Sequence, residues 1–270
     1  MTDRYGVIGH PIGHSKSPII HRLFAAQTGE DLSYEAFDVA PEALESRLRA
    51  FAAEGLRGLN VTVPHKEQVA RLVDQLTDRA HLAGAVNTVT IAVDGRLDGD
   101  NTDGVGLLTD LTKNLDVRLA DACVLVLGAG GATRGIVPAL LGSGPHDLVV
   151  ANRTLERARA LASHFERLGS IAACRFDELA GRRFDLVINA TSAGLQGSVP
   201  PFPAAMLTPE TVCYDLSYAM ADTPFVAWAR SHGVQHAHQG WGMLVEQAAE
   251  AFFIWRGVRP DTTPVRAKLP

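Results

Sequence analysis

The sequence has little cysteine, no long apolar run and no cluster of basic residues. Its three cysteines, Cys123, Cys174 and Cys213, lie in no CxxC or cysteine–histidine spacing, so we expect free thiols in a reducing compartment and no metal site. The longest apolar stretches, such as Cys123–Leu127, are far shorter than the roughly 18 residues of a membrane span. The 25 basic and 30 acidic residues give a net charge of −5, without the basic stripe typical of nucleic-acid binders.

Apolar residues make up 46% of the chain and charged residues 20%, which is typical of a folded protein with a substantial core. The length of 270 residues suits one large domain or two small ones. The first strand-like segment, residues 5–9, comes almost at once, with no charged-then-apolar signal pattern before it. We therefore expect a cytoplasmic protein with neither a membrane nor a nucleic-acid partner.

Strand-like and helix-like segments alternate along the chain in two different ways. Residues 1–103 include a hairpin signal at Asp94-Gly95 and a predicted helix over residues 66–76. From residue 104 to 237, continuous Val/Leu/Ile strands alternate with helices, which predicts a parallel sheet covered on both faces. The pattern indicates an α/β fold with two domains, an α/β domain and a Rossmann-like, doubly wound parallel-sheet domain, with a cleft between them.

A glycine-rich turn follows the predicted strand at residues 123–127. It consists of Gly128, Ala129, Gly130, Gly131 and Ala132. A strand, such a turn and then a helix is the context in which free N–H groups at the helix start bind a pyrophosphate, and glycine lets the backbone approach it closely. Thr133 stands where a third glycine is usual, and an ordinary tight turn is the alternative explanation. The context favours a dinucleotide site.

The residues after the next predicted strand distinguish the two nicotinamide cofactors. An acidic residue there binds the ribose hydroxyls of NAD, whereas an arginine suits the extra phosphate of NADP. The sequence reads Asn152-Arg153-Thr154, with no acid before Glu156. A cation near a helix start is disfavoured unless it meets an anion, although a solvent-exposed arginine is the simpler alternative. The pattern favours NADP.

Several polar residues of the first hundred also stand out. Lys66 would begin the predicted helix over residues 66–76, where the helix dipole poises an ammonium group for proton transfer. Asn87 lies among apolar neighbours and must find hydrogen-bond partners in the protein or in a ligand. Asp103, Ser15 and Ser17 each precede or begin a predicted helix and could cap it, and the serines could equally hold a carboxylate. Taken singly, each of these residues has a structural explanation.

Taken together, these segments resemble the shikimate dehydrogenase family. The similar segments, in order along the chain, are residues 9–18 (GHPIGHSKSP), 60–66 (NVTVPHK), 84–88 (GAVNT), 101–104 (NTDG), 128–132 with 152–154, and 243–248 (MLVEQA). Six ordered motifs over almost the whole chain are far more specific than any one of them. The chain departs from the commonest pattern at residues 219–222 (AMAD), where a proline is often seen, and at Trp241, where a smaller residue is common.

The resemblance implies an enzyme that reduces 3-dehydroshikimate to shikimate with NADPH, reversibly, on the route to chorismate and the aromatic amino acids. It implies a substrate-binding domain of residues 1–103 and 238–270 and an NADP-binding domain of residues 104–237. The implied catalytic pair is Lys66 and Asp103. The implied substrate-binding residues are Ser15, Ser17, Thr62, Lys66, Asn87, Asp103, Tyr218 and Gln247. The implied cofactor-binding residues are Asp78, Gly128, Ala129, Gly130, Gly131, Ala132, Asn152, Arg153, Thr154, Arg157, Leu216 and Gly240.

Three other functions remain open at this point. One is a related dehydrogenase that accepts quinate, or NAD, as readily as shikimate and NADP. Another is a non-catalytic NADP-binding regulator that keeps the fold, against which Lys66 and Asp103 argue. The third, a folate dehydrogenase with a similar layout, lacks motifs that match residues 14–18. The sequence leaves a monomer and a homodimer equally open.

Overall fold

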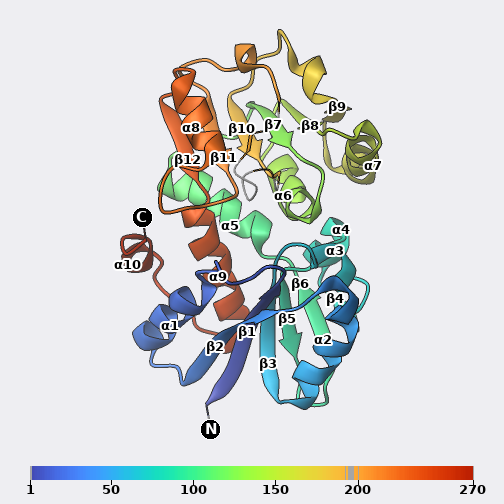
Figure 1. Ribbon diagram of the computed structural model, residues 1–270, viewed down its shortest axis with the longest axis vertical. Helices are drawn as coiled ribbons and strands as arrows, with labels where there is room; N and C mark the ends of the chain where they lie inside the picture. Colours follow the sequence, from blue (N-terminus) through green and yellow to red (C-terminus); the bar gives the residue numbers. More distant parts are fainter. Residues whose placement is uncertain (1, 192, 194–197, 200, 270) are drawn as a thin grey trace. The chain divides into compact units, whose positions relative to one another are not determined.

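The computed structural model describes residues 2–191, 193, 198–199 and 201–269. The chain divides into two compact units, one of Met1–Leu107 with Leu244–Leu269 and one of Leu108–Met243 (Figure 1). The chain passes from one unit to the other inside helix α5 (Asp103–Thr109) and inside helix α9 (Trp241–Arg256). These crossings lie a few residues beyond the domain limits expected at residues 103 and 238.

The first unit is built on a mixed six-stranded sheet. Its strand order is β2-β1-β3-β5-β6-β4, in which β1 runs parallel to β2 and β3, and β5 runs antiparallel to β3 and β6. The strands are β1 (Asp3–Gly9), β2 (Leu32–Asp38), β3 (Leu56–Val61), β4 (Gln75–Leu76), β5 (Thr88–Ile91) and β6 (Leu97–Asp100). The predicted hairpin at Asp94-Gly95 joins β5 to β6, and Gly95 supplies the positive φ of 86° that its turn requires.

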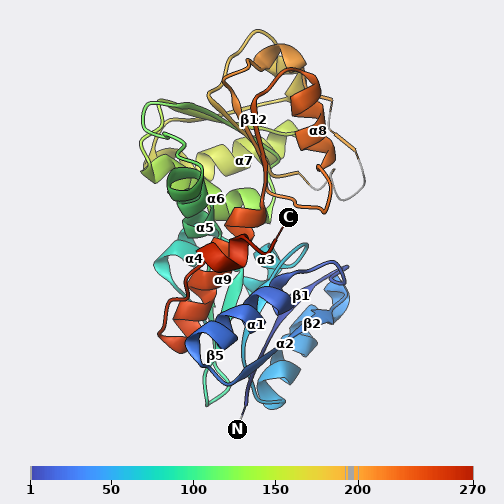
Figure 2. The same cartoon turned by 90° about the vertical axis from the view of Figure 1, so that its left-hand side faces the viewer.

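Helices cover this sheet through apolar faces. In α2, the residues Leu44, Leu48 and Phe51 are buried, as expected of one face of an amphipathic helix. Helix α1 packs alongside α9 through Phe24 and Phe252 (Figure 2). The helices wholly within this unit are α1 (Ser17–Thr28), α2 (Leu44–Ala53), α3 (Lys66–Val69), α4 (Asp78–Ala83) and α10 (Thr263–Arg266).

The predicted helix over residues 66–76 is wrong beyond its first turn. Helix α3 ends at Val69, and residues 75–76 form strand β4, which pairs with β6. The carboxylate of Asp74 accepts a hydrogen bond from the backbone N–H of Leu97 and binds Arg49. Residues 70–74 form a turn and a bend, and these long-range contacts lead the chain into β4, because they satisfy backbone and side-chain groups that a continued helix would leave unpaired.

The second unit is an all-parallel six-stranded sheet with the order β12-β11-β10-β7-β8-β9. This is the order of a Rossmann-type sheet, with the reversal between β7 and β10, and it confirms the predicted fold class. The strands are β7 (Cys123–Leu127), β8 (Asp147–Ala151), β9 (Ile171–Cys174), β10 (Leu186–Asn189), β11 (Val212–Asp215) and β12 (His236–Gln239). The main helices are α6 (Gly131–Gly142), α7 (Leu155–Phe165) and α8 (Pro224–Ser231). Of the helices in the described ranges, none combines the length and apolar character that a bilayer crossing requires.

Candidate active site

Lys66 and Asp103 form a close ion pair in the first unit. Lys66 is the first residue of α3, and Asp103 is the first residue of α5, three positions after the last residue of β6. The Nζ atom of Lys66 lies 2.5 Å from Oδ2 of Asp103. Only 12% of the lysine side chain and 4% of the aspartate side chain are exposed. The structure thus brings together the two residues that the sequence predicts as a catalytic pair, although 37 positions separate them.

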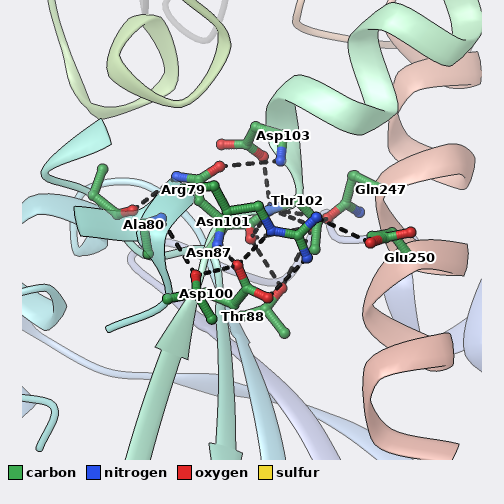
Figure 3. Close-up of polar contacts among 12 residues, drawn as sticks. Arg79, Ala80, Asn87, Thr88, Asp100, Asn101, Thr102, Asp103, Gln247 and Glu250 are labelled. Carbon is green, nitrogen blue, oxygen red and sulfur yellow. Dashed lines mark hydrogen bonds and ion pairs between the residues drawn. The ribbon is translucent and has the colours of Figure 1, made fainter. Parts of the chain in front are cut away.

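Asn87 binds the carboxylate oxygen of Asp103 that Lys66 does not contact. Its Nδ2 group donates to Oδ1 of Asp103 at 2.8 Å and to Oε1 of Gln247 at 3.2 Å (Figure 3). The same amide contacts the Thr102 hydroxyl, and its Oδ1 atom accepts a hydrogen bond from the Thr102 backbone N–H at 2.8 Å. The partners that a buried amide requires are therefore two predicted substrate-binding residues together with Thr102 and Thr88, whose hydroxyl donates to Oδ1 of Asn87 at 2.9 Å.

Gln247 lies on α9 and is largely buried, with 9% of the residue exposed. Its position depends on Gly106 of α5, because a Cβ atom at residue 106 would lie only 2.7 Å from Cβ of Gln247. Glycine therefore permits the two helices to approach at this point. Sequence periodicity alone places Gln247 on a polar, solvent-exposed stripe of the last helix, and Gly106 is a signal that the sequence analysis missed.

Asn101 and Thr102 were also missed, although they lie inside a recognised motif. The side chain of Asn101 accepts a hydrogen bond from the backbone N–H of Asp103 at 3.1 Å and donates to the carbonyl of Ala85 at 2.8 Å. Both Asn101 and Thr102 are buried. The motif that carries Asp103 therefore fixes the start of α5 through its own side chains, and Asp103 itself is free to face Lys66.

The predicted carboxylate-binding serines and Thr62 follow the carboxyl ends of two neighbouring parallel strands, β1 and β3. Ser17 is the first residue of α1, and its backbone N–H donates to Oγ of Ser15 at 3.3 Å. The predicted capping by Ser17 is thus wrong, since the helix begins one residue earlier than expected. The close approach of Gly9 to Thr62, where a Cβ atom would lie 2.6 Å from the Thr62 methyl group, brings the two loops together.

The glycine turn of the second unit joins β7 to α6. Gly128 has a φ of 105°, and a Cβ atom there would lie 3.0 Å from the carbonyl oxygen of Ala190, which follows β10. By contrast, a Cβ atom at Gly130 would meet no atom within 4 Å, so open space lies beside the start of the helix. Thr133 is buried and donates from its hydroxyl to the Gly128 carbonyl at 2.9 Å, which explains how threonine replaces the usual third glycine. The turn lies where the strand order reverses, the place where such sheets bind their ligands.

Two further predicted cofactor groups lie at the carboxyl ends of strands in the second unit. After β8, the Asn152 side chain donates to the Thr154 carbonyl at 2.9 Å, and Arg153 and Arg157 are exposed. Arg153 precedes the first residue of α7 by two positions. After β11 and β12, Gly240 lies so close to Leu216 that a Cβ atom would be 2.5 Å from the Leu216 carbonyl oxygen.

Two predicted site residues lie in a different unit from the rest of their set. Tyr218 belongs to the second unit, where its ring centroid lies 4.5 Å from that of Trp241, whereas the other predicted substrate-binding residues belong to the first. Asp78 begins α4 in the first unit and is exposed, whereas the other predicted cofactor-binding residues belong to the second. In the described part of the chain, no group of three or more His, Cys, Asp or Glu side chains is arranged to hold a metal ion.

The whole chain is similar to known proteins. It is 56% identical over 269 residues to the shikimate dehydrogenase (NADP(+)) of Alkalilimnicola ehrlichii, which covers 100% of this chain and 99% of that protein. The chain belongs to the shikimate dehydrogenase family. Three models of this family match it: the shikimate dehydrogenase substrate binding domain at residues 7–89, shikimate / quinate 5-dehydrogenase at residues 110–196, and the shikimate 5'-dehydrogenase C-terminal domain at residues 240–269.

Other proteins are similar to this chain in sequence or in fold. The shikimate dehydrogenase (NADP(+)) of Methylococcus capsulatus is 56% identical over 265 residues, covering 98% of this chain and 95% of that protein. The structure of shikimate 5-dehydrogenase from Thermus thermophilus in complex with NADP(H) and shikimate superposes with a TM-score of 0.87 at 37% identity, covering 98% of each chain. The Ael1 enzyme of Pseudomonas putida reaches a TM-score of 0.90 at 45% identity, covering 99% of this chain and 98% of that one.

Proposed function

We propose that the protein reduces 3-dehydroshikimate to shikimate with NADPH, reversibly, as a step on the route to chorismate and the aromatic amino acids. The observation that carries this proposal is the contact between Lys66 and Asp103, buried and braced by Asn87. Relatives over the full length of the chain are named as NADP-dependent shikimate dehydrogenases, and the Thermus thermophilus structure holds both ligands. In this scheme the first unit binds the substrate and the second binds NADP.

The second unit fits NADP. The open space beside Gly130 would take the pyrophosphate against the N-terminus of α6, where free N–H groups face an anion. Arg153 is exposed and would reach the phosphate that distinguishes NADP from NAD. The remaining residues of the second unit proposed to line this site are Gly128, Ala129, Gly131, Ala132, Asn152, Thr154, Arg157, Leu216 and Gly240. When bound, NADP(H) supplies or accepts the hydride.

In the first unit, Lys66 would carry the proton. Its Nζ group donates a proton to the ketone oxygen of 3-dehydroshikimate as that oxygen becomes an alkoxide, and takes the proton back in the reverse direction. Asp103 orients the ammonium group through the 2.5 Å contact and accepts a hydrogen bond from a neighbouring substrate hydroxyl. Asn87 fixes the carboxylate of Asp103, so the catalytic pair is oriented before the substrate arrives.

The other proposed substrate contacts fall into two groups, one for the carboxylate of the substrate and one for its ring hydroxyls. Ser15 and Ser17 would bind the carboxylate, since hydroxyl and backbone N–H groups gather at the start of α1. Thr62, Asn87 and Gln247 would bind the ring hydroxyls. This division makes the carboxylate and the hydroxyl pattern of the ring the features that the site would recognise.

A steady-state assay tests the proposal. Purified protein is given shikimate or quinate together with NADP or NAD, and the absorbance of the reduced nicotinamide is followed. We expect the largest kcat/KM with shikimate and NADP. Comparable values with quinate or with NAD would instead indicate the broader activity suggested by the shikimate / quinate family model. Binding of NADP without turnover on either substrate would contradict the proposed reaction.

We also propose that the protein works in the cytoplasm, as a monomer or a homodimer. Cys123, Cys174 and Cys213 are free thiols, two of them buried, which suits a reducing compartment. Light scattering during size-exclusion chromatography distinguishes the two assemblies.

A further inference from the structure

Arg79 bridges two carboxylates that belong to different elements of the first unit. Its Nε and Nη2 groups donate to the two oxygens of Asp100, at 2.6 and 2.8 Å, and its Nη1 group donates to Oε1 of Glu250 at 3.0 Å (Figure 3). Asp100 ends strand β6, whereas Glu250 lies on α9. A planar guanidinium can hold both carboxylates at once because its donors form a fixed fork.

Asp100 connects this bridge to the catalytic pair. Its carboxylate accepts a hydrogen bond from the backbone N–H of Asn101 at 2.7 Å, and the side chain of Asn101 in turn accepts one from the N–H of Asp103. The backbone carbonyl of Asp100 also accepts a hydrogen bond from the N–H of Asn87 at 3.0 Å. A shift of Asp100 would therefore move both Asp103 and the amide that braces it.

Glu250 connects the same bridge to Gln247. The two residues are three positions apart on α9 and so lie on the same side of the helix. Gln247 reaches the amide of Asn87 from that side, as Figure 3 shows. Arg79 thus links α9 to the end of β6. This link lies beside Asn87, which contacts both Gln247 and Asp103.

The carboxylates of Asp100 and Glu250 are charged, which strengthens their contacts with Arg79. Burial acts to raise the pKa of Asp100, but hydrogen bonds from Arg79 and Thr77 outweigh it and hold that pKa below its ordinary value. Burial acts in the same way on Glu250, where Arg259 and Arg79 lower the pKa again. Both carboxylates are therefore ionised at neutral pH, and each needs its cationic partner because an unpaired charge in this environment is costly.

We propose that Arg79 is a positioning residue that sets the spacing between Asp103 and Gln247, so that both can bind the hydroxyls of one substrate molecule. The proposal rests on the proposed function of these two residues. It predicts that loss of Arg79 weakens the use of shikimate specifically, because the residues proposed to line the NADP site in the second unit make no part of this bridge.

The test compares Arg79→Gln with a matched control, Arg49→Gln. Arg49 also donates to both carboxylate oxygens of an aspartate, Asp74, at 3.1 Å each. Asp74 in turn accepts a hydrogen bond from Leu97, the first residue of β6, the strand that ends at Asp100. We expect Arg79→Gln to lower kcat/KM for shikimate by about 10- to 100-fold, mainly through KM, as a displaced binding group does. The KM for NADP should not change. Arg79→Lys should recover part of the lost kcat/KM, since lysine keeps the positive charge but cannot hold both carboxylates as the guanidinium does. Arg49→Gln should have the same kcat/KM as the unchanged protein.

A double-mutant cycle separates positioning from general destabilisation. If Arg79 acts through Gln247, Arg79→Gln should lower kcat/KM for shikimate less in the Gln247→Ala variant than it does in the unchanged protein. If Arg79→Gln does not fold, Glu250→Ala carries the test, because it keeps the pair of Arg79 with Asp100 and removes the acceptor that links Arg79 to α9. Additive losses, or equal kinetics for the Arg79 and Arg49 variants, would overturn the inference. An unchanged protein that does not oxidise shikimate would instead overturn the proposed function.

Discussion

Acid should destabilise the protein through one buried histidine that takes no part in the proposed chemistry. His21 lies on α1 with no exposed surface, and its ring stacks on that of Tyr34, with the centroids 4.1 Å apart and the planes 5° apart. Burial, which outweighs the opposing effect of Asn60, lowers the pKa of His21 from 6.5 to about 3. The folded protein therefore keeps this ring neutral in mildly acidic solution.

The magnitude follows from the difference between the two states. In the unfolded chain the ring takes up a proton as the pH falls through 6.5, whereas in the folded protein it does so only near pH 3. This contribution to stability is complete above pH 6.5 and is lost as the pH falls toward 3. Each pH unit in that window lowers the free energy of unfolding by about 1.4 kcal/mol, so the step from pH 6.5 to about pH 5 should cost about 2 kcal/mol.

Urea unfolding of His21→Phe at several pH values measures this effect. Phenylalanine keeps a ring against Tyr34 and takes up no proton, so its free energy of unfolding should fall less steeply below pH 6.5 by about 1.4 kcal/mol per pH unit. Burial also lowers the pKa values of His65 and His238, but both remain in the variant, and the difference isolates His21. His146→Gln, at an exposed position, is the control. Equal slopes for His21→Phe and the unchanged protein would refute the reasoning.

Two further predictions concern the proposed NADP site. Arg153→Ala should raise the KM for NADP far more than that for NAD, and steady-state assays with both cofactors check this; an equal loss for both would count against a phosphate contact. Gly130→Ala should raise the KM for NADP without lowering the melting temperature, because the added methyl group enters open space. Gly128→Ala should instead destabilise the protein by about 1–2 kcal/mol, because its φ is 105°. Thermal melts that show the same loss for both glycine variants would contradict this contrast.

The parallel sheet of the second unit was predictable because its strands are buried on both faces. Strands such as Cys123–Leu127 and Asp147–Ala151 are continuous apolar runs, and the glycine turn between them marks the start of a helix. The helix over residues 66–76 was predicted wrongly because local periodicity cannot register the pairing of β4 with β6. A two-residue strand has almost no sequence signal of its own.

The burial of the polar face of α9 could not be predicted from the sequence pattern. Glu246, Gln247 and Glu250 have the spacing of a solvent-exposed stripe, yet each is at most 9% exposed. Two of their partners, Arg79 for Glu250 and Asn87 for Gln247, lie more than 150 positions away in the chain. A hydrophobic pattern predicts which apolar face is buried, but it cannot indicate that a charged face is buried against charges from another segment.

The most direct test of the account is the rate at which shikimate reduces NADP in the protein and in its Lys66→Ala variant. Because Lys66 would carry the proton beside Asp103, the variant should lose about 10²- to 10⁴-fold in kcat, with a much smaller change in the KM for shikimate. Lys113→Ala, at an exposed position of the second unit, should retain the full rate. A Lys66→Ala variant that turns over as fast as the unchanged protein would contradict the role of the buried pair.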